Sequence, residues 1–323
     1  MEKKTAGSSA AKKGYVFCIC AGFAWGCAGV SGQFLFEEKL WDVNFMIPLR
    51  MFVAGWIMLL LASRVEKTGD LFKVFRTRRN LIDLLIFASM GVSLCQYSYY
   101  ATIDASNATT ATILCYLGPV LITLWVALRN RSMPAWNELV ALAAAVAGTF
   151  FLTTHGDLST LVLSDRALFW GLISALSTAV YSIQPKRVTA ECGTLTTIAW
   201  AMLLASVGLF AICQPWNHMQ GTYDISAWFF FFIVVLVGSV VCYSLYFSGL
   251  QLIGPTKASI LSVTELIVSA LLSVFWLQVV FVPMDYLGIV LVGSTVFILA
   301  IPVKKKMKSS QIKKDEQKEQ HPS

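Results

Sequence analysis

The residue with the clearest chemical potential is Glu265, a single carboxylate inside an apolar segment. Its surroundings, SILSVTELIVSALLSVFW over residues 259–276, are apolar or small at every other position. If such a segment crosses a bilayer, a charge at its centre costs on the order of 3 kcal/mol, so the carboxyl must be protonated, paired or facing water. A carboxyl that can change between these conditions suits the binding of a proton or an amine. The alternative is a permanently neutral Glu that is hydrogen-bonded to a neighbouring helix.

Arg50 is the basic counterpart, because it alone among the Lys and Arg residues lies deep in an apolar segment, next to Pro48. Three roles suit it: attraction of a carboxylate on a bound molecule, an ion pair with an acid such as Asp104 or Glu38, or a side chain that extends to the lipid headgroups. The sequence leaves these roles open.

Large polar and aromatic side chains inside the apolar segments form a second set of candidates. At about 100° per residue they fall on single faces of helices, and their size and spread over several segments favour a water-filled cavity over a tight seam. The stronger candidates for cavity lining are Gln96, Tyr100, Tyr181 and Gln184. Aromatic residues also serve in cores and at membrane interfaces, so the weaker candidates are Trp25, Tyr97, Trp200 and Tyr243.

Metal and catalytic chemistry are not indicated. The three histidines, His155, His218 and His321, are scattered over loops and a tail, and the eight Cys include no CxxC pair, so neither a metal site nor a disulfide is predicted. No cofactor and no catalytic residue are predicted. The sequence also lacks a GxxxxGK[ST] phosphate-binding loop.

The elements that must position these residues are membrane-spanning helices. The chain of 323 residues is 57% hydrophobic and 13% charged, with a mean hydropathy of +0.68, well above an ordinary soluble domain. Runs of roughly 20 apolar residues match the hydrocarbon thickness and must be helical, because backbone in lipid has to satisfy its own hydrogen bonds. We therefore predict an all-α polytopic membrane protein with ten transmembrane helices at 14–36, 45–63, 81–102, 107–128, 136–153, 166–185, 194–213, 227–250, 256–279 and 285–302.

Basic residues give the predicted orientation. With the N-terminus in the cytoplasm, every Lys and Arg except Lys39, Arg50 and Arg166 falls in a cytoplasmic loop or tail, which is the positive-inside pattern. Both termini are therefore expected in the cytoplasm. The net charge of +7 is explained by these loops near anionic headgroups, so no nucleic-acid partner is predicted.

The third to fifth spans align with the eighth to tenth at a constant offset of 147 positions, which pairs Cys95 with Cys242 and Tyr99 with Tyr246. Each half then has five helices, an odd number, so the halves enter the membrane in opposite directions, as in many secondary transporters. The predicted organisation is a cytoplasmic basic tail (1–13), a first five-helix repeat (14–153), an extracytoplasmic linker (154–165), a second repeat (166–302) and a cytoplasmic basic tail (303–323).

Over nearly the whole chain this pattern resembles the EamA-type branch of the drug/metabolite transporter superfamily. The resemblance rests on the arginine of PLRMFVAG, on ILCYLGPVLITLWVAL and on its counterpart ILSVTELIVSALLSVFWL. Family members often carry an acid followed by proline in the fourth and ninth helices. Here the first copy has Gly118 before Pro119, and the second has Leu266 after Glu265.

The resemblance implies a secondary transporter, not an enzyme, that moves a small organic metabolite across the cytoplasmic (inner) membrane by alternating access. An amino acid or related compound is one candidate, export is the favoured direction, and a proton is a candidate coupling ion. Oligomeric state stays open, a homodimer included. Two rival readings are a membrane-embedded enzyme on lipid-linked substrates, which would need convergent catalytic groups, and a sensory or scaffold protein without transport.

Overall fold

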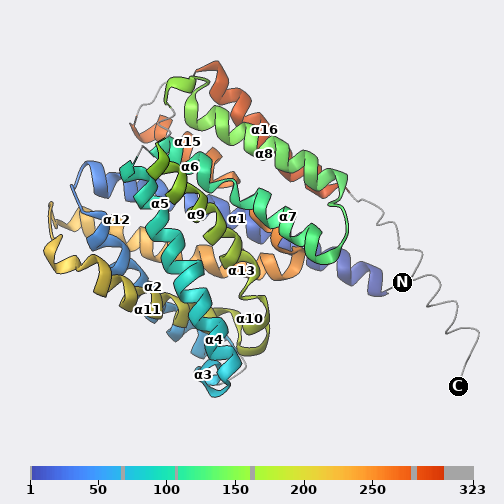
Figure 1. Cartoon of the computed structure of the whole chain (residues 1–323), viewed down its shortest axis with the longest axis horizontal. Coiled ribbons are helices and arrows are strands. Elements are labelled where there is room, and N and C mark those ends of the chain that lie inside the picture. The colour runs from blue at the N-terminus through green and yellow to red at the C-terminus, as the bar shows by residue number, and fades with distance from the viewer. Residues whose placement is uncertain (1, 67–69, 106–107, 161–163, 278–281, 302–323) are drawn as a thin grey trace, which may run out of the picture.

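Helices form in each of the ten apolar ranges that the sequence predicts. The computed structural model describes residues 2–66, 70–105, 108–160, 164–277 and 282–301, and its regular structure over these residues is entirely helical (Figure 1). The predicted all-α class is therefore confirmed.

The first half of the chain contains six helical segments, some of them made of two or three consecutive helices, and one of the six is very short. Its elements are α1 (Glu2–Glu37), α2 (Val43–Val65), α3 (Lys73–Arg76), α4 (Arg78–Ile86) continuing through the π-helical turn η1 (Phe87–Ser93) into α5 (Leu94–Ala105), α6 (Ala108–Cys115) followed by α7 (Gly118–Asn130), and α8 (Trp136–Thr154). Because α1 begins at Glu2, the helix also runs through the segment that we predicted as a tail.

The second half repeats this order. Its elements are η2 (Leu158–Thr160), α9 (Asp165–Ile183), α10 (Lys186–Cys192), α11 (Thr194–Cys213), η3 (Pro215–Asn217), α12 (Ile225–Val235) continuing through the π-helical turn η4 (Leu236–Val241) into α13 (Cys242–Ile253), α14 (Pro255–Ser262) followed by α15 (Thr264–Leu277), and α16 (Pro283–Ala300).

Within the described ranges, seven helices are long and apolar enough to cross a membrane. Two shorter apolar helices, Trp136–Phe151 and Pro283–Leu299, occupy the fifth and tenth predicted spans, and the ninth is divided between α14 and α15. The chain is thus built to pass through a bilayer many times. The count of ten crossings stays a prediction.

Regular helix is interrupted at matching places in the two halves. The π turns η1 and η4 lie in the third and eighth predicted spans, and breaks separate α6 from α7 and α14 from α15. At the first break Pro119 has no N–H to donate to the carbonyl four residues earlier, which favours a break there. At the second break Val263 N–H donates to Ile260 O, three residues back, at 3.3 Å, so a tight turn replaces one turn of α-helix.

The two halves pack in a reciprocal way. Helix α2 of the first half lies along α11 of the second, and α8 of the first half lies along α16 of the second. Helix α1 packs against α13 and α15, while α9 packs against α5, α6 and α7. Glycines permit two of these contacts. A Cβ on Gly238 would lie 2.3 Å from Ala28 Cβ, and one on Gly91 would lie 3.2 Å from Tyr181 Cα. The π turns therefore come close to their neighbours only because they carry glycine.

Corresponding helices run in opposite directions. The start of α9 lies beside the end of α5, where Ser164 Oγ donates to Ala105 O at 3.2 Å, and its end lies beside Asp83 of α4. The N-terminal part of α1 lies beside the end of α13, where a Cβ on Gly14 would lie 2.6 Å from Ile253 Cγ2. The starts of α1 and α4 belong to the same end of the bundle, so α1 and α9 are antiparallel and the repeats are inverted.

We call the end that contains Glu66, Lys73, Arg187 and Lys257 the basic end. Its loops are tied together: Glu66 accepts hydrogen bonds from Leu195 N and Thr196 N at the start of α11, at 2.7 and 3.1 Å, and Lys73 donates to Glu191 O at 2.7 Å. A carboxylate at a helix N-terminus is favoured by the helix dipole, which fixes α2 against α11.

The opposite end carries different contacts. Lys39 pairs with Asp224 at 2.7 Å, and His155 Nδ1 lies 2.6 Å from Asp285 Oδ1. The hydrogen bond from Lys39, with that from Ala227 N–H, holds the pKa of the Asp224 carboxyl down at about 2. Asp224 therefore keeps its charge as the N-cap of α12 across the physiological range.

Candidate functional site

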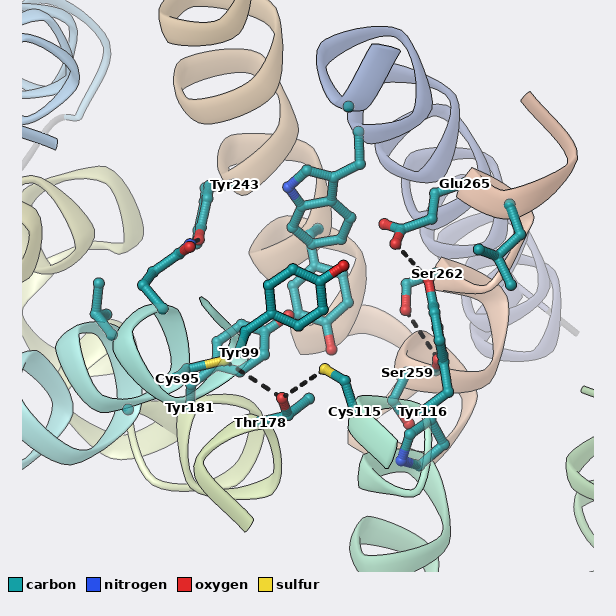
Figure 2. Close-up of a pocket in the computed structure, with 18 of the residues that line it drawn as sticks. Cys95, Tyr99, Cys115, Tyr116, Thr178, Tyr181, Tyr243, Ser259, Ser262 and Glu265 are labelled. Atoms are coloured by element: carbon teal, nitrogen blue, oxygen red, sulfur yellow. Dashed lines mark hydrogen bonds between the residues drawn. The ribbon is translucent and has the colours of Figure 1, made fainter. Parts of the chain in front are cut away.

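A cavity of about 460 Å³ lies at the middle of the bundle. Its walls come from α1, from η1 and α5, from α9 and α13, and from both helix breaks (Figure 2). Because both repeats contribute the same elements, the cavity lies at the interface between the halves, the usual place of a transporter's binding site.

Glu265 and Tyr116 form the polar pair of one wall. The Tyr116 hydroxyl donates a hydrogen bond to Oε1 of Glu265, and both side chains line the cavity (Figure 2). Tyr116 lies in the break between α6 and α7, whereas Glu265 lies in the first turn of α15. A carboxylate in that turn is stabilised by the positive end of the helix dipole.

The face of α1 sets the position of Glu265. A Cβ on Gly22 would lie 3.2 Å from Glu265 N, and a Cβ on Gly26 would lie 2.8 Å from Glu265 O. Because a side chain at either position would meet backbone atoms, the two glycines allow α1 to approach the start of α15 and hold the carboxyl toward the cavity.

The wall across from Glu265 holds a bond between repeat-equivalent residues. Gln96 Nε2 donates to Tyr243 Oη at 3.4 Å, and the two residues are 147 positions apart, which is the offset of the repeat. Residues that correspond in the two halves thus meet directly. The polar pair Gln96–Tyr243 lies on the pseudo-symmetry axis, while Glu265 lies to one side of it.

Aromatic rings form another part of the lining. Trp25 contacts the rings of Tyr243 and Tyr246, with centroids 5.7 and 5.2 Å apart, and Tyr181 stacks on Tyr246 at 5.7 Å. Ser182 Oγ and Tyr246 Oη are 3.0 Å apart. Tyr99 adds a further ring to the lining. The cavity therefore offers aromatic surface to a bound molecule.

Two thiols converge on one hydroxyl in the same wall. Cys95 Sγ lies 3.3 Å from Thr178 Oγ1, and Cys115 Sγ lies 3.7 Å from it. These contacts join α5 and α6 to α9 (Figure 2). Ser262 Oγ donates to Ser259 O at 2.9 Å, so that hydroxyl hydrogen is engaged within α14.

A layer of buried rings lies on the side of the cavity that faces the basic end. Tyr246, Phe247 and Phe87 are among the largest fully buried side chains. Phe247 contacts Phe87 and Tyr181, with ring centroids 5.7 Å apart in each case. These residues follow the lining residues along their helices toward the basic end, so the layer lies between the cavity and the loops there.

Five of the residues singled out from the sequence line this cavity. They are Trp25, Gln96, Tyr181, Tyr243 and Glu265. Their participation in transport stays a prediction.

Three other predicted lining residues lie elsewhere. Gln184 follows the last residue of α9 and donates to Asp83 O at 2.9 Å. Trp200 donates to Leu71 O at 2.8 Å and packs between Phe72 and Phe75 at the basic end. Tyr97 is 40% exposed and its ring meets Trp170, because it follows Gln96 by one residue and therefore lies about 100° around the helix from it. The side chain of Tyr100 lies outside the described residues.

Arg50 is not among the residues that line the cavity. It is half-buried on α2, and its Nε is buried without a hydrogen-bond partner among the described residues. The suggested pair with Glu38 is not formed in this part of the structure, and the side chain of Asp104 lies outside the described residues.

The candidate site residues taken from the sequence did not include Tyr116, Tyr99, Tyr246 or the pair of thiols. Tyr99, Tyr246 and Cys95 stood among the positions that are identical at the repeat offset, so that identity was an available signal for them. Tyr116 had no such signal, because its partner Glu265 is 149 positions away.

The fold and the cavity define a polytopic helical protein with one central site shared by two inverted halves. The sequence model of the EamA-like transporter family matches residues 12–154 and, a second time, residues 165–301. The chain therefore belongs to the EamA-like transporter family, and it is a multi-pass membrane protein of a transporter family.

Relatives extend over nearly the whole chain. The inner membrane transporter YicL of Salmonella typhimurium is 35% identical over 303 residues, which cover 93% of this chain and 99% of YicL. Solute carrier family 35 member F3 of Mus musculus is 27% identical over 326 residues, covering 89% of this chain and 72% of the carrier. A crystal structure with 16% identity superposes with a TM-score of 0.74 over 91% of this chain and 96% of its own, which supports the fold.

Proposed function

We propose that the protein is a secondary transporter that carries a small organic metabolite across the cytoplasmic membrane by alternating access. The central cavity is its transport site, and Glu265 is the group that binds the solute or a coupling proton. The observation that carries this proposal is one carboxylate in a cavity framed by the breaks of both repeats. Irregular backbone within a membrane is tolerated where it lines such a cavity.

The inverted repeats supply the means of alternation. Two similar halves that cross in opposite directions can exchange conformations, so that a site at their interface opens first to one side and then to the other. The ring layer of Tyr246, Phe247 and Phe87 lies between the cavity and the basic end. In the proposed cycle this layer separates when the site opens to the cytoplasm.

Orientation and energy source follow from the sequence. The Lys and Arg residues collected at the basic end support a cytoplasmic location for that end and for both termini. Without a phosphate-binding loop, the proposed coupling is to a proton or to exchange of solutes. The proposed direction is export, which rests on the family resemblance alone.

The test is a flux assay that follows a metabolite comparison. Cells with and without the protein are compared for solutes that change between cytosol and medium, and each such solute is assayed in proteoliposomes. Wild type, Glu265→Gln and the control Glu38→Gln, whose side chain is exposed at the opposite end, are measured side by side. Flux in wild type and control but not in Glu265→Gln supports the proposal. Equal redistribution with and without the protein, and no flux in liposomes, contradicts it.

A further inference from the structure

Resting on the proposed function, we infer that the transported solute is an organic monocation with an apolar, ring-containing body: a protonated amine or a quaternary nitrogen compound. The inference follows from the charge, the free acceptor and the aromatic side chains of the cavity.

The charge of the lining is one-sided. Glu265 is the single acidic residue among the described lining residues, and none of them is Lys, Arg or His. A buried charge is tolerated when an opposite charge meets it. A cation would supply that charge to Glu265, whereas an anion would find no partner, and the carboxylate of an amino acid would be left unmatched.

Glu265 has an oxygen available for a ligand. Tyr116 donates to Oε1, and no partner for Oε2 is found in the described residues. Figure 2 shows the carboxyl directed into the cavity. An ammonium donating to Oε2 would make a charge-assisted hydrogen bond, about twice as strong as a neutral one. Tyr116 is a positioning residue here, because it fixes the carboxyl and leaves one oxygen to the solute.

The aromatic side chains of the lining suit a cation as well as its apolar body. Trp25, Tyr99, Tyr181, Tyr243 and Tyr246 all line the cavity. The faces of tryptophan and tyrosine rings attract cations, and the attraction is stronger when water is excluded. A volume of about 460 Å³ lies within the range of small-molecule sites. The charged end would lie at α15 and the body between Trp25 and Tyr181.

Arg50 provides the competing explanation. If the solute were a zwitterion, its carboxylate would have to reach Arg50, whose Nε lacks a partner. Because Arg50 is not among the lining residues, binding of the solute should not depend on its side chain. A matched set of probes can separate the two cases.

The experiment measures binding of three probes with the same phenyl body to the detergent-solubilised full chain by titration calorimetry. The probes are 2-phenylethylammonium, phenylalanine and 3-phenylpropanoate. We expect the amine to bind about tenfold or more tightly than phenylalanine, and 3-phenylpropanoate not to bind. Glu265→Gln should weaken amine binding by about tenfold or more, Glu265→Asp should weaken it less, and Arg50→Gln should leave the order of the probes unchanged.

Three results would overturn the inference: tighter binding of phenylalanine or 3-phenylpropanoate than of the amine, no binding of the amine, or amine binding that is equal in wild type and in a monodisperse Glu265→Gln. Retained elution volume and unfolding temperature show that a variant is folded. Failure of the transport proposal looks different, because the amine would then bind through Glu265 while no probe crosses a proteoliposome. Conversely, flux of an anionic solute would keep transport and refute the cation.

Discussion

The two helix breaks occupy equivalent places in the repeats, yet they carry different chemistry. α6 ends at Cys115 and α14 ends at Ser262, which correspond at the repeat offset. The first break contains Tyr116 and Pro119 but no acid, while the second contains Glu265 and no proline. The side chains of the two breaks then meet, because Tyr116 donates to Glu265. Each half supplies one member of a pair that neither half contains alone.

This difference shows how a symmetric fold can build an asymmetric site. Symmetry brings equivalent residues on the axis together, as in the bond between Gln96 and Tyr243, and it would place a second acid in the same central region if both breaks kept one. Two carboxylates close together cannot both ionise easily. With Gly118 in the first break, the cavity holds one negative charge, and that charge is off the axis.

The largest effect is expected when the charge beside the second helix break is removed, because this charge is the main difference between the two breaks. Glu265→Gln keeps the shape and leaves Tyr116 with a weaker, neutral acceptor. Loss of one partner of a buried charged pair costs several kcal/mol, so we expect flux to fall by on the order of a hundredfold. Initial rates in proteoliposomes measure this, with Glu38→Gln as the control; retained flux in Glu265→Gln would remove the acid from the mechanism.

The second prediction concerns the contact that holds the second break in place. In Gly26→Ala the new Cβ would lie 2.6 Å from Val268 Cβ and 2.8 Å from Glu265 O. Because a backbone atom cannot move aside, we expect a loss of ~1–3 kcal/mol in stability, together with reduced flux. Thermal unfolding in detergent measures it. Gly208→Ala is the matched control, since a Cβ there meets nothing within 4 Å; an equal shift in both variants would mean that α1 does not constrain Glu265.

Much of this arrangement could be predicted from the sequence, and the reason is the solvent. Lipid forces each apolar run of sufficient length into a helix, so the ranges of the helices and the special position of Glu265 follow from local composition. The structure adds that spans three and eight share an irregularity, the π turns η1 and η4.

What sequence could not supply were contacts that depend on where a helix ends and what lies beside it. Tyr181 and Gln184 share a helical stripe, but α9 ends at Ile183, so only Tyr181 remains at cavity level. Trp200 belongs to α11, which packs on α2 and away from the cavity. Tyr116 bonds a residue of the other repeat, and periodicity within one helix carries no information about such a partner.

A third prediction tests the contribution of the first break. Tyr116→Phe removes the hydroxyl that donates to Glu265 and keeps the ring. A hydrogen bond to a charged group contributes about 1.5–3 kcal/mol, so we expect roughly tenfold weaker amine binding. Calorimetry measures it. Tyr223→Phe removes a hydroxyl bonded to Gln220 O at the opposite end and serves as the control. Unchanged amine binding in Tyr116→Phe would show that Glu265, at the second break, does not need the hydroxyl of Tyr116, at the first break, to bind the amine.

The smallest expected effect comes from giving the second break the proline of the first. In Leu266→Pro the bond from Leu266 N to Val263 O, now 3.0 Å, is lost, at a cost of about 1 kcal/mol. Proline is tolerated in the first turn of a helix, and Pro119 occupies the equivalent place in α7. In the wild type every residue at the break between α14 and α15 has a backbone N–H, so the break can convert to continuous helix. A proline at position 266 would prevent this conversion.

If the second break moves during transport, Leu266→Pro should bind the amine nearly as well as wild type but turn over several-fold more slowly. If binding and turnover both stay at the wild-type level, the two breaks are equally rigid, and their difference is one of charge alone.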